Sequence, residues 1–182
     1  MKRMLITLMA AAAAAMLAAC NTEGEGGGPS AGPAYTPPSG GAGEAFRDAD
    51  FAWSTASGAD AIDGVVAYSR GGARYTCDGT DVVLVPDTPW VRARMRVLYL
   101  STTSAAMAAD DVRERTPAEH SADYARYARR APCDASNHFA FSGLPDGSWF
   151  AITVATPVAG GQKIAVMRRV ATHGGTQRLT MP

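Results

Sequence analysis

The chain has 182 residues, which is long enough for one folded domain with its own hydrophobic core and argues against two. Its 17 basic residues balance its 17 acidic residues, so that the formal net charge is zero. A chain without a basic excess is not typical of proteins whose main partner is nucleic acid, and we expect no such partner.

The N-terminus has the pattern of an export signal. Lys2 and Arg3 supply a positive start, and the apolar run at residues 4–17 is too short to span a bilayer but suits a signal h-region. The sequence Leu-Ala-Ala-Cys that follows, ending at Cys20, resembles the lipobox of bacterial lipoproteins. The resemblance implies that residues 1–19 are a removed signal peptide and that Cys20 receives the lipid.

The alternative is an ordinary secretory signal cut near Ala19, with Cys20 left as a free thiol. An exposed, unpaired thiol is a liability in an oxidising compartment, so we expect lipidation. Two or three acyl chains on one residue hold a protein on a bilayer with negligible release, whereas a single chain holds it reversibly. Asn21, rather than Asp, follows the cysteine, and the lipoprotein resemblance then implies the outer membrane as the anchoring site in the cell envelope.

Residues 21–44 consist mainly of Gly, Pro, Ser, Ala and Glu. Such a composition cannot bury enough apolar surface to offset the entropy of ordering, so the sequence predicts a disordered linker over residues 20–45. A flexible coil of about 24 residues spans on the order of 25–30 Å, which would lift a domain off the lipid head groups. We therefore place the folded domain at residues 46–182.

With Cys20 assigned to lipid, Cys77 and Cys133 remain as an even pair. In an exported chain a disulfide between them is the expected outcome. Closing a loop of about 55 residues would stabilise the fold by about 4 kcal/mol on the loop-entropy model. The alternative is two buried thiols that never meet.

Most of the folded region has the pattern of short β-strands. Segments rich in Val, Ile and aromatic residues alternate with Gly and Pro turns. We expect strands at residues 62–68, 74–77, 82–85, 91–103, 139–141, 149–154, 163–171 and 177–181. Phe46, Phe51 and Trp53 predict an N-terminal edge segment packed against this sheet structure. Short strands at regular spacing favour a β-sandwich.

The pattern changes at about residues 104–131. Residues 105–115 and 117–130 carry Ala, Met, Asp, Glu and Arg without β-branched runs, and Tyr124 and Tyr127 recur at helical spacing. Pro117 is typical of the first position of a helix. The sequence therefore predicts a helical insertion in a domain that is otherwise mainly β.

One strand–turn–strand motif is specific enough to suggest a family. The stretch FAFSGLPDGSWF (residues 139–150) places two Phe on one strand face, reverses the chain and starts the next strand with aromatic residues. With the segments at residues 62–66 and 82–86, it resembles the carboxypeptidase-regulatory-like, or transthyretin-like, β-sandwich family over about residues 62–181. The resemblance implies a single sandwich that acts as a non-catalytic module. The hydrolase branch of that family ends in Tyr-Arg-Gly-Ser, which is absent here.

Candidates for catalysis and metal binding are few. His120, His138 and His173 are scattered and have no H-x-H or H-x₃-H spacing, so neither a metal site nor a cofactor is expected. No G-x-S-x-G elbow surrounds any serine. We predict no catalytic residue.

Three arginines form a possible anion-binding site. Arg92, Arg94 and Arg96 alternate with apolar residues, and strand alternation would place all three on one face, where they could bind envelope phosphate or carboxylate groups. The favoured alternative is a solvated face paired with the acidic residues of the helical insertion. Trp90 and Trp149 could stack on a sugar ring, although both are more typical of a core or its edge.

These observations favour a lipid-anchored cell-envelope lipoprotein whose β-sandwich is a non-catalytic binding or structural module for an envelope protein or glycan. The alternative is an envelope hydrolase or metal-dependent enzyme with its site between the helical insertion and the sheet. The lack of a recognisable nucleophile–base pair argues against that alternative.

Overall fold

The computed structural model describes residues 45–117 and 122–182. They belong to the larger of two units of the chain, Pro38–Pro182. The predicted signal peptide, Cys20, nearly all of the predicted linker and His120 lie outside the described residues. No helix in the described ranges combines the length and the apolarity that crossing a membrane requires.

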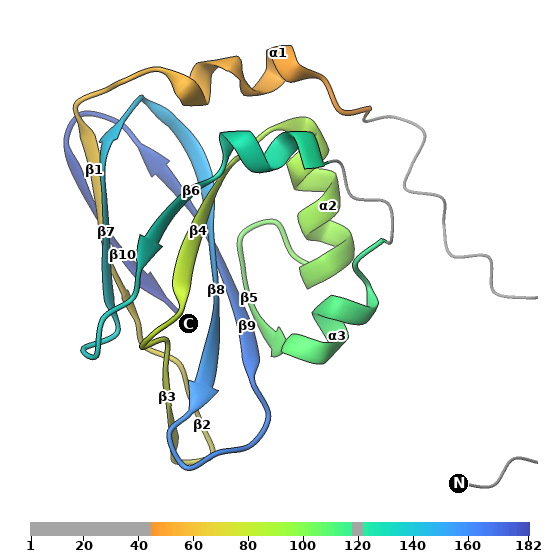
Figure 1. Cartoon of the computed structure of the whole chain (residues 1–182), viewed down its shortest axis with the longest axis vertical. Coiled ribbons are helices and arrows are strands. Elements are labelled where there is room, and N and C mark those ends of the chain that lie inside the picture. Colours follow the sequence, from red (N-terminus) through yellow and green to blue (C-terminus); the bar gives the residue numbers. More distant parts are fainter. Residues whose placement is uncertain (1–44, 118–121) are drawn as a thin grey trace, which may run out of the picture. The chain divides into compact units, whose positions relative to one another are not determined.

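A small sheet of three strands forms one layer of the domain (Figure 1). Its central strand pairs in parallel with the C-terminal strand and antiparallel with the third. In sheet order, the strands are β10 (Thr176–Met181), β1 (Asp60–Val66) and β7 (His138–Leu144).

A larger antiparallel sheet forms the second layer. Its longest strand, β8 (Gly147–Pro157), pairs with β4 on one side and with β9 on the other. The other strands are β4 (Asp81–Pro86), β6 (Arg129–Pro132), β9 (Ile164–Thr172), β5 (Ser104–Ala108), β3 (Ala73–Thr76) and β2 (Ser69–Arg70). β6 and β5 lie beyond β4 and β9 respectively, and β3 continues along the far end of β8.

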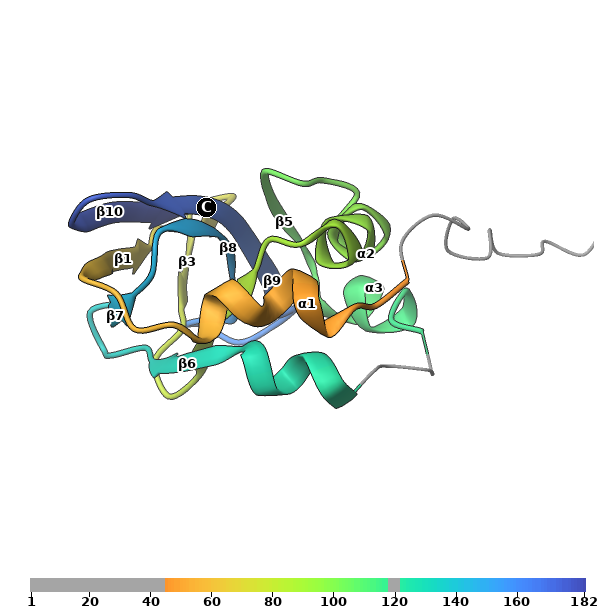
Figure 2. The same cartoon turned by 90° about the horizontal axis from the view of Figure 1, so that it is seen from above.

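Helices cover the face of the large sheet that points away from the small sheet (Figure 2). They are α1 (Asp48–Phe51), α2 (Pro89–Tyr99), α3 (Ala109–Glu114) and the 3₁₀ helix η2 (Ala122–Tyr127). A further 3₁₀ helix, η1 (Ala52–Thr55), follows α1, and its Trp53 packs on Trp149 in the core between the two sheets. The predicted class, a mainly β sandwich with a helical segment, is confirmed.

The large sheet is buried on both faces, and successive residues of its strands serve different cores. On β8, Trp149 belongs to the core between the two sheets, whereas Phe150 belongs to the core beneath the helices. Val166 and Met167 of β9 divide in the same way. This double burial explains why these strands read as nearly continuous apolar runs.

The prediction of a strand at residues 91–103 is wrong, because the first part of this segment belongs to helix α2. The Thr88 hydroxyl caps this helix by accepting a hydrogen bond from Val91 N at 3.2 Å, and Pro89 occupies the first turn. Val91, Met95 and Leu98 point into the core with helical spacing. The apolar positions Val91 and Met95 satisfy both a two-residue and a four-residue repeat, so alternation alone misassigned the segment.

The insertion is also less helical than predicted. Residues 104–108 form strand β5 along the edge of β9, and only residues 109–114 of the first expected helix are helical. Of the second, residues 118–121 lie outside the described residues, residues 122–127 form a 3₁₀ helix, and strand β6 begins at Arg129. The N-terminal edge segment packs as expected but is helical, with Phe51 completely buried.

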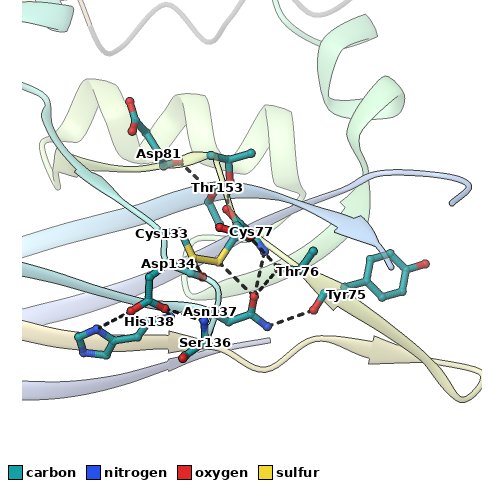
Figure 3. Close-up of a disulfide and its surroundings, with 12 residues drawn as sticks. Tyr75, Thr76, Cys77, Asp81, Cys133, Asp134, Ser136, Asn137, His138 and Thr153 are labelled. Carbon is teal, nitrogen blue, oxygen red and sulfur yellow. Dashed lines mark hydrogen bonds and ion pairs between the residues drawn. A yellow bond between two sulfur atoms is a disulfide. The ribbon is translucent and has the colours of Figure 1, made fainter. Parts of the chain in front are cut away.

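Cys77 and Cys133 form the predicted disulfide, with a Cα–Cα distance of 5.7 Å (Figure 3). Both residues are buried in the core between the sheets. Asn137 lies beside the disulfide in a left-handed conformation with φ of 64°. Its side-chain oxygen accepts hydrogen bonds from Thr76 Oγ1 at 2.8 Å and Cys77 N at 3.1 Å, and its Nδ2 donates to the Tyr75 carbonyl at 3.1 Å. The turn before β7 is thereby joined to the end of β3.

Candidate functional site

A patch of aromatic side chains lies where the N-terminus of α2 meets α1 and η2. We call it the aromatic patch; its members are the half-buried residues Phe46, Trp90, Tyr124 and Tyr127. They surround the buried ring of Phe51. The contacts are an edge-on Phe46–Trp90 pair at 5.5 Å, a Trp90–Tyr124 pair at 5.3 Å and a stacked Phe51–Tyr127 pair at 4.9 Å between ring centroids.

The local sequence explains the position of Trp90. Because Thr88 and Pro89 start α2, Trp90 lies in its first turn, and Arg94 lies four residues later on the same helix face. The Arg94 guanidinium carbon lies 5.4 Å from the Trp90 centroid and 5.9 Å from that of Tyr124. A guanidinium stacked on aromatic rings keeps its in-plane N–H groups available as donors.

Polar groups border the other end of the aromatic patch. Arg126 lies over the Tyr127 ring at 5.0 Å and forms an ion pair with Asp48. The Tyr127 hydroxyl donates to Asp48 Oδ1 at 3.1 Å. Apolar ring surface bordered by a few charged and hydroxyl groups is the usual composition of a small-ligand site.

The three arginines singled out in the sequence do not all share a face, because a helix rotates by about 200° over two residues and Arg94 therefore points away from Arg92 and Arg96. Arg92 is bound to Asp87, Arg94 stacks in the aromatic patch, and Arg96 is exposed. Among the described residues, the carboxylate that pairs with Arg92 is that of Asp87, in the segment before α2. The prediction that Arg92, Arg94 and Arg96 lie on one face of a strand is therefore wrong.

Trp90 and Trp149 differ in burial. Trp149 is completely buried, and its indole N–H donates to Thr172 Oγ1 at 3.1 Å, so it serves the core. Trp90 is only half-buried. The signal that could have distinguished them is the Thr88–Pro89 pair, which marks a helix start and places Trp90 at the edge of the domain.

The described histidines stand apart from each other, each beside carboxylates. His138 Nε2 lies 2.8 Å from Asp63 Oδ1, and its Nδ1 lies 3.8 Å from Asp134 Oδ2. Both ring nitrogens thus face carboxylates, which leaves neither facing a nucleophile. His173 Nδ1 lies 3.2 Å from Asp146 Oδ2. Within residues 45–117 and 122–182, no group of three or more His, Cys, Asp or Glu is placed to hold a metal ion.

The space between the helical layer and the large sheet, where the alternative hypothesis places an active site, is packed with apolar side chains. Met95, Leu98 and Tyr99 of α2 are buried against Phe150 and Met167 of the sheet. Burial raises the pKa of the Tyr99 phenol, so this group stays neutral. The described residues of this layer thus form a core.

The described part of the chain is a β-sandwich with a helical layer on one sheet. No family model matches the sequence, and no curated protein matches it. Among solved structures, it is similar to the crystal structure of a candidate carbohydrate-binding protein from Pseudomonas aeruginosa, with a TM-score of 0.56 and 18% identity. The likeness covers 76% of this chain and 97% of the other. At this identity the match establishes a shared fold.

Proposed function

We propose that this protein is an envelope lipoprotein whose β-sandwich domain binds glycan and carries out no chemistry of its own. The observation that carries the proposal is the aromatic patch, where the half-buried residues Trp90 and Tyr124 lie next to the donors of Arg94. Sugar rings present one apolar face and a rim of hydroxyl groups, which matches partly exposed aromatic rings bordered by polar side chains. The fold shared with a candidate carbohydrate-binding protein supports the same ligand class.

The sequence at Cys20 supports the location. A basic start, a short apolar run and Leu-Ala-Ala-Cys resemble the processing signal of lipoproteins. The disulfide between Cys77 and Cys133 agrees with an exported chain, because such bonds persist in oxidising compartments. In the proposed arrangement, a lipidated cysteine and a linker attach a glycan-binding domain to the outer membrane. We assign this domain to the carboxypeptidase-regulatory-like family of β-sandwiches.

Retention on immobilised envelope polysaccharide tests the binding function. The wild-type protein is expected to be retained, and Trp90→Ala is expected to weaken retention by about tenfold, as loss of a central aromatic contact does in other interfaces. Val158→Ala is the matched control, since Val158 is an exposed apolar residue (64%) outside the aromatic patch. Equal retention of Trp90→Ala and the control, or no retention of the wild type, contradicts the proposal.

Replacement of Cys20 by serine tests the anchor separately. We expect the wild-type protein to partition with membranes and to carry a mass increase from its acyl chains, and Cys20→Ser to lose both. Unchanged mass and unchanged partitioning in the variant would overturn the lipoprotein assignment while leaving glycan binding open to its own test.

A further inference from the structure

A second candidate site lies at the step in the large sheet where strand β5 begins beside β9. The hollow at this step has a volume of about 360 Å³ and is lined by Thr103, Ser104, Arg168, Arg169, Val170 and Ala171. β5 pairs with residues 164–168 of β9, so β9 extends beyond the start of β5. Arg169 N donates to the Thr103 carbonyl at 2.7 Å and closes the inner end of this step.

The hollow carries positive charge. Two guanidinium groups and no carboxylate belong to the residues that line it. Because Arg168 and Arg169 are neighbours on a strand, their side chains leave β9 on opposite faces at the edge of the hollow. Within the described residues, Arg168 forms no ion pair, so its charge is not neutralised there.

Arg169 is held in one orientation before any ligand arrives. Its Nε donates to Asp87 Oδ2 at 2.5 Å, and its Nη2 donates to Ser148 Oγ at 3.1 Å. The Asp87 side chain is fully buried, and 41% of the Arg169 side chain remains exposed. A guanidinium has five N–H donors, so donors remain for a ligand, and a side chain already fixed loses little entropy on binding.

The loop on the other side of the hollow is ordered by its own hydrogen bonds. Ser101 Oγ accepts from Thr103 N at 3.2 Å and from Ser104 N at 3.3 Å. The hydroxyl groups of Thr103 and Ser104 therefore come from a fixed backbone and add neutral donors beside the two arginines. Guanidinium groups and hydroxyls are donors that recognise carboxylate and phosphate oxygens.

We propose that this hollow binds the anionic group, carboxylate or phosphate, of an acidic saccharide. The inference rests on the proposed function for its ligand class and adds a second contact, which makes the domain selective for charged over neutral sugars. Arg168 and Arg169 bind the anion, and Thr103 and Ser104 donate to its oxygens or to an adjacent sugar hydroxyl.

Calorimetric titration of the purified full-length protein tests the proposal. The probes are galacturonate with galactose as its neutral match, and glucose 6-phosphate with glucose as its neutral match. The two acidic sugars distinguish a carboxylate from a phosphate ligand. We expect at least one of them to bind about tenfold more tightly than its neutral match, which is the effect of one charge-assisted contact.

Arg168→Gln is the decisive variant, because Arg168 is exposed and its replacement leaves the Asp87 cluster intact. It is expected to remove the preference for the acidic sugar, whereas Arg96→Gln, which replaces an exposed arginine of α2 outside the hollow, is expected to keep it. Binding of neither acidic sugar, equal affinity for acidic and neutral sugars, or the same preference in both variants overturns the inference.

The two proposals fail differently. In one outcome, the protein binds neutral sugars through Trp90 and binds acidic sugars no more tightly. This outcome supports the proposed function and refutes the anion site. A preference for acidic sugars that depends on Arg168 and persists in Trp90→Ala supports the anion site and refutes the role of the aromatic patch.

Discussion

Arg169 donates from Nε to the fully buried carboxylate of Asp87 at 2.5 Å, across 82 residues of sequence. Arg92 donates to the other carboxylate oxygen at 3.0 Å, so each oxygen of Asp87 has its own guanidinium partner. The two arginines come from β9 and α2, and Asp87 lies between β4 and α2. This cluster therefore ties the helical layer to the sheet.

Loss of one guanidinium from this cluster should destabilise the fold, because the buried Asp87 carboxylate would keep only one of its two guanidinium partners. We expect Arg169→Gln to lower the free energy of unfolding by about 1–3 kcal/mol, at the low end for a buried pair because Arg169 is itself partly exposed. Urea denaturation measures the change. Arg168→Gln is the matched control and should stay within about 0.5 kcal/mol of wild type; equal effects of the two variants would contradict the role of the cluster.

Reduction of the disulfide should cost much of the stability of the domain. Cys77 and Cys133 are 56 residues apart, and release of this loop is expected to lower the free energy of unfolding by about 4 kcal/mol. The Cys77→Ser/Cys133→Ser variant should show the same loss without reductant. Denaturation curves with and without dithiothreitol provide the measurement, and insensitivity of the wild type to reductant would show that the bond is not needed.

Asn137 combines a left-handed backbone with three side-chain hydrogen bonds, and two substitutions separate these contributions. Asn137→Gly keeps the backbone conformation and loses the hydrogen bonds, which we expect to cost about 2 kcal/mol. Asn137→Ala loses both and should cost about 1 kcal/mol more. Thermal or urea unfolding measures both values. An alanine variant as stable as the glycine variant would show that the backbone conformation matters little.

The pKa of Asp146 lies below its usual value of 3.8, first because of its interaction with the neighbouring Asp60 side chain and second because of His173. The deprotonated form of Asp146 is thus favoured by the fold. Its contribution to stability is present above the unfolded-state pKa and is lost as pH falls through the lower folded-state pKa. NMR titration of the Asp146 carboxyl carbon should give a midpoint below 3.8.

The same titration in variants separates the two causes. Asp60→Ala is expected to raise the pKa of Asp146 more than His173→Gln does, following the order of the two effects. Asp60 also accepts a hydrogen bond from Gly175 N at 2.6 Å, so the fold of that variant is checked by its spectrum before titration. A larger shift in His173→Gln would make the imidazole the main cause.

Gly64 allows close contact between β1 and β7. A Cβ atom at this position would lie 2.2 Å from Cζ of Phe139, whose ring is 1% exposed and cannot move freely. We therefore expect Gly64→Ala to lower the free energy of unfolding by about 2 kcal/mol. Phe139→Leu, introduced together with Gly64→Ala, should relieve the overlap, so that the two losses are less than additive in a double-mutant cycle.

Sequence alone determined most of the sheet and the disulfide partners. The segments around residues 62–68, 82–85, 139–141, 149–154, 163–171 and 177–181 lie in strands, because their β-branched and aromatic side chains suit a pleated surface and Gly or Pro turns separate them. Cys77 and Cys133 were identifiable as a pair by counting, once Cys20 was set aside.

Only the tertiary structure decided which segments form the helical layer and the sheet edge. Val91 and Met95 fit either a strand or a helix, and the second face of the large sheet supplied the apolar surface that α2 covers. Residues 104–108 are mostly alanines with helical propensity, yet the open edge of β9 offered backbone hydrogen bonds that drew them into β5.

Both candidate sites depend on contacts between residues far apart in the chain. Tyr124 reaches Trp90 through packing within the helical layer, and Arg169 reaches Asp87 across β8, which pairs with both β9 and β4. Local patterns record which residues prefer a strand or a helix, whereas the burial of one surface on another is set by the whole domain. The sequence therefore determined the body of the fold, and packing between its layers decided where aromatic rings and guanidinium groups meet.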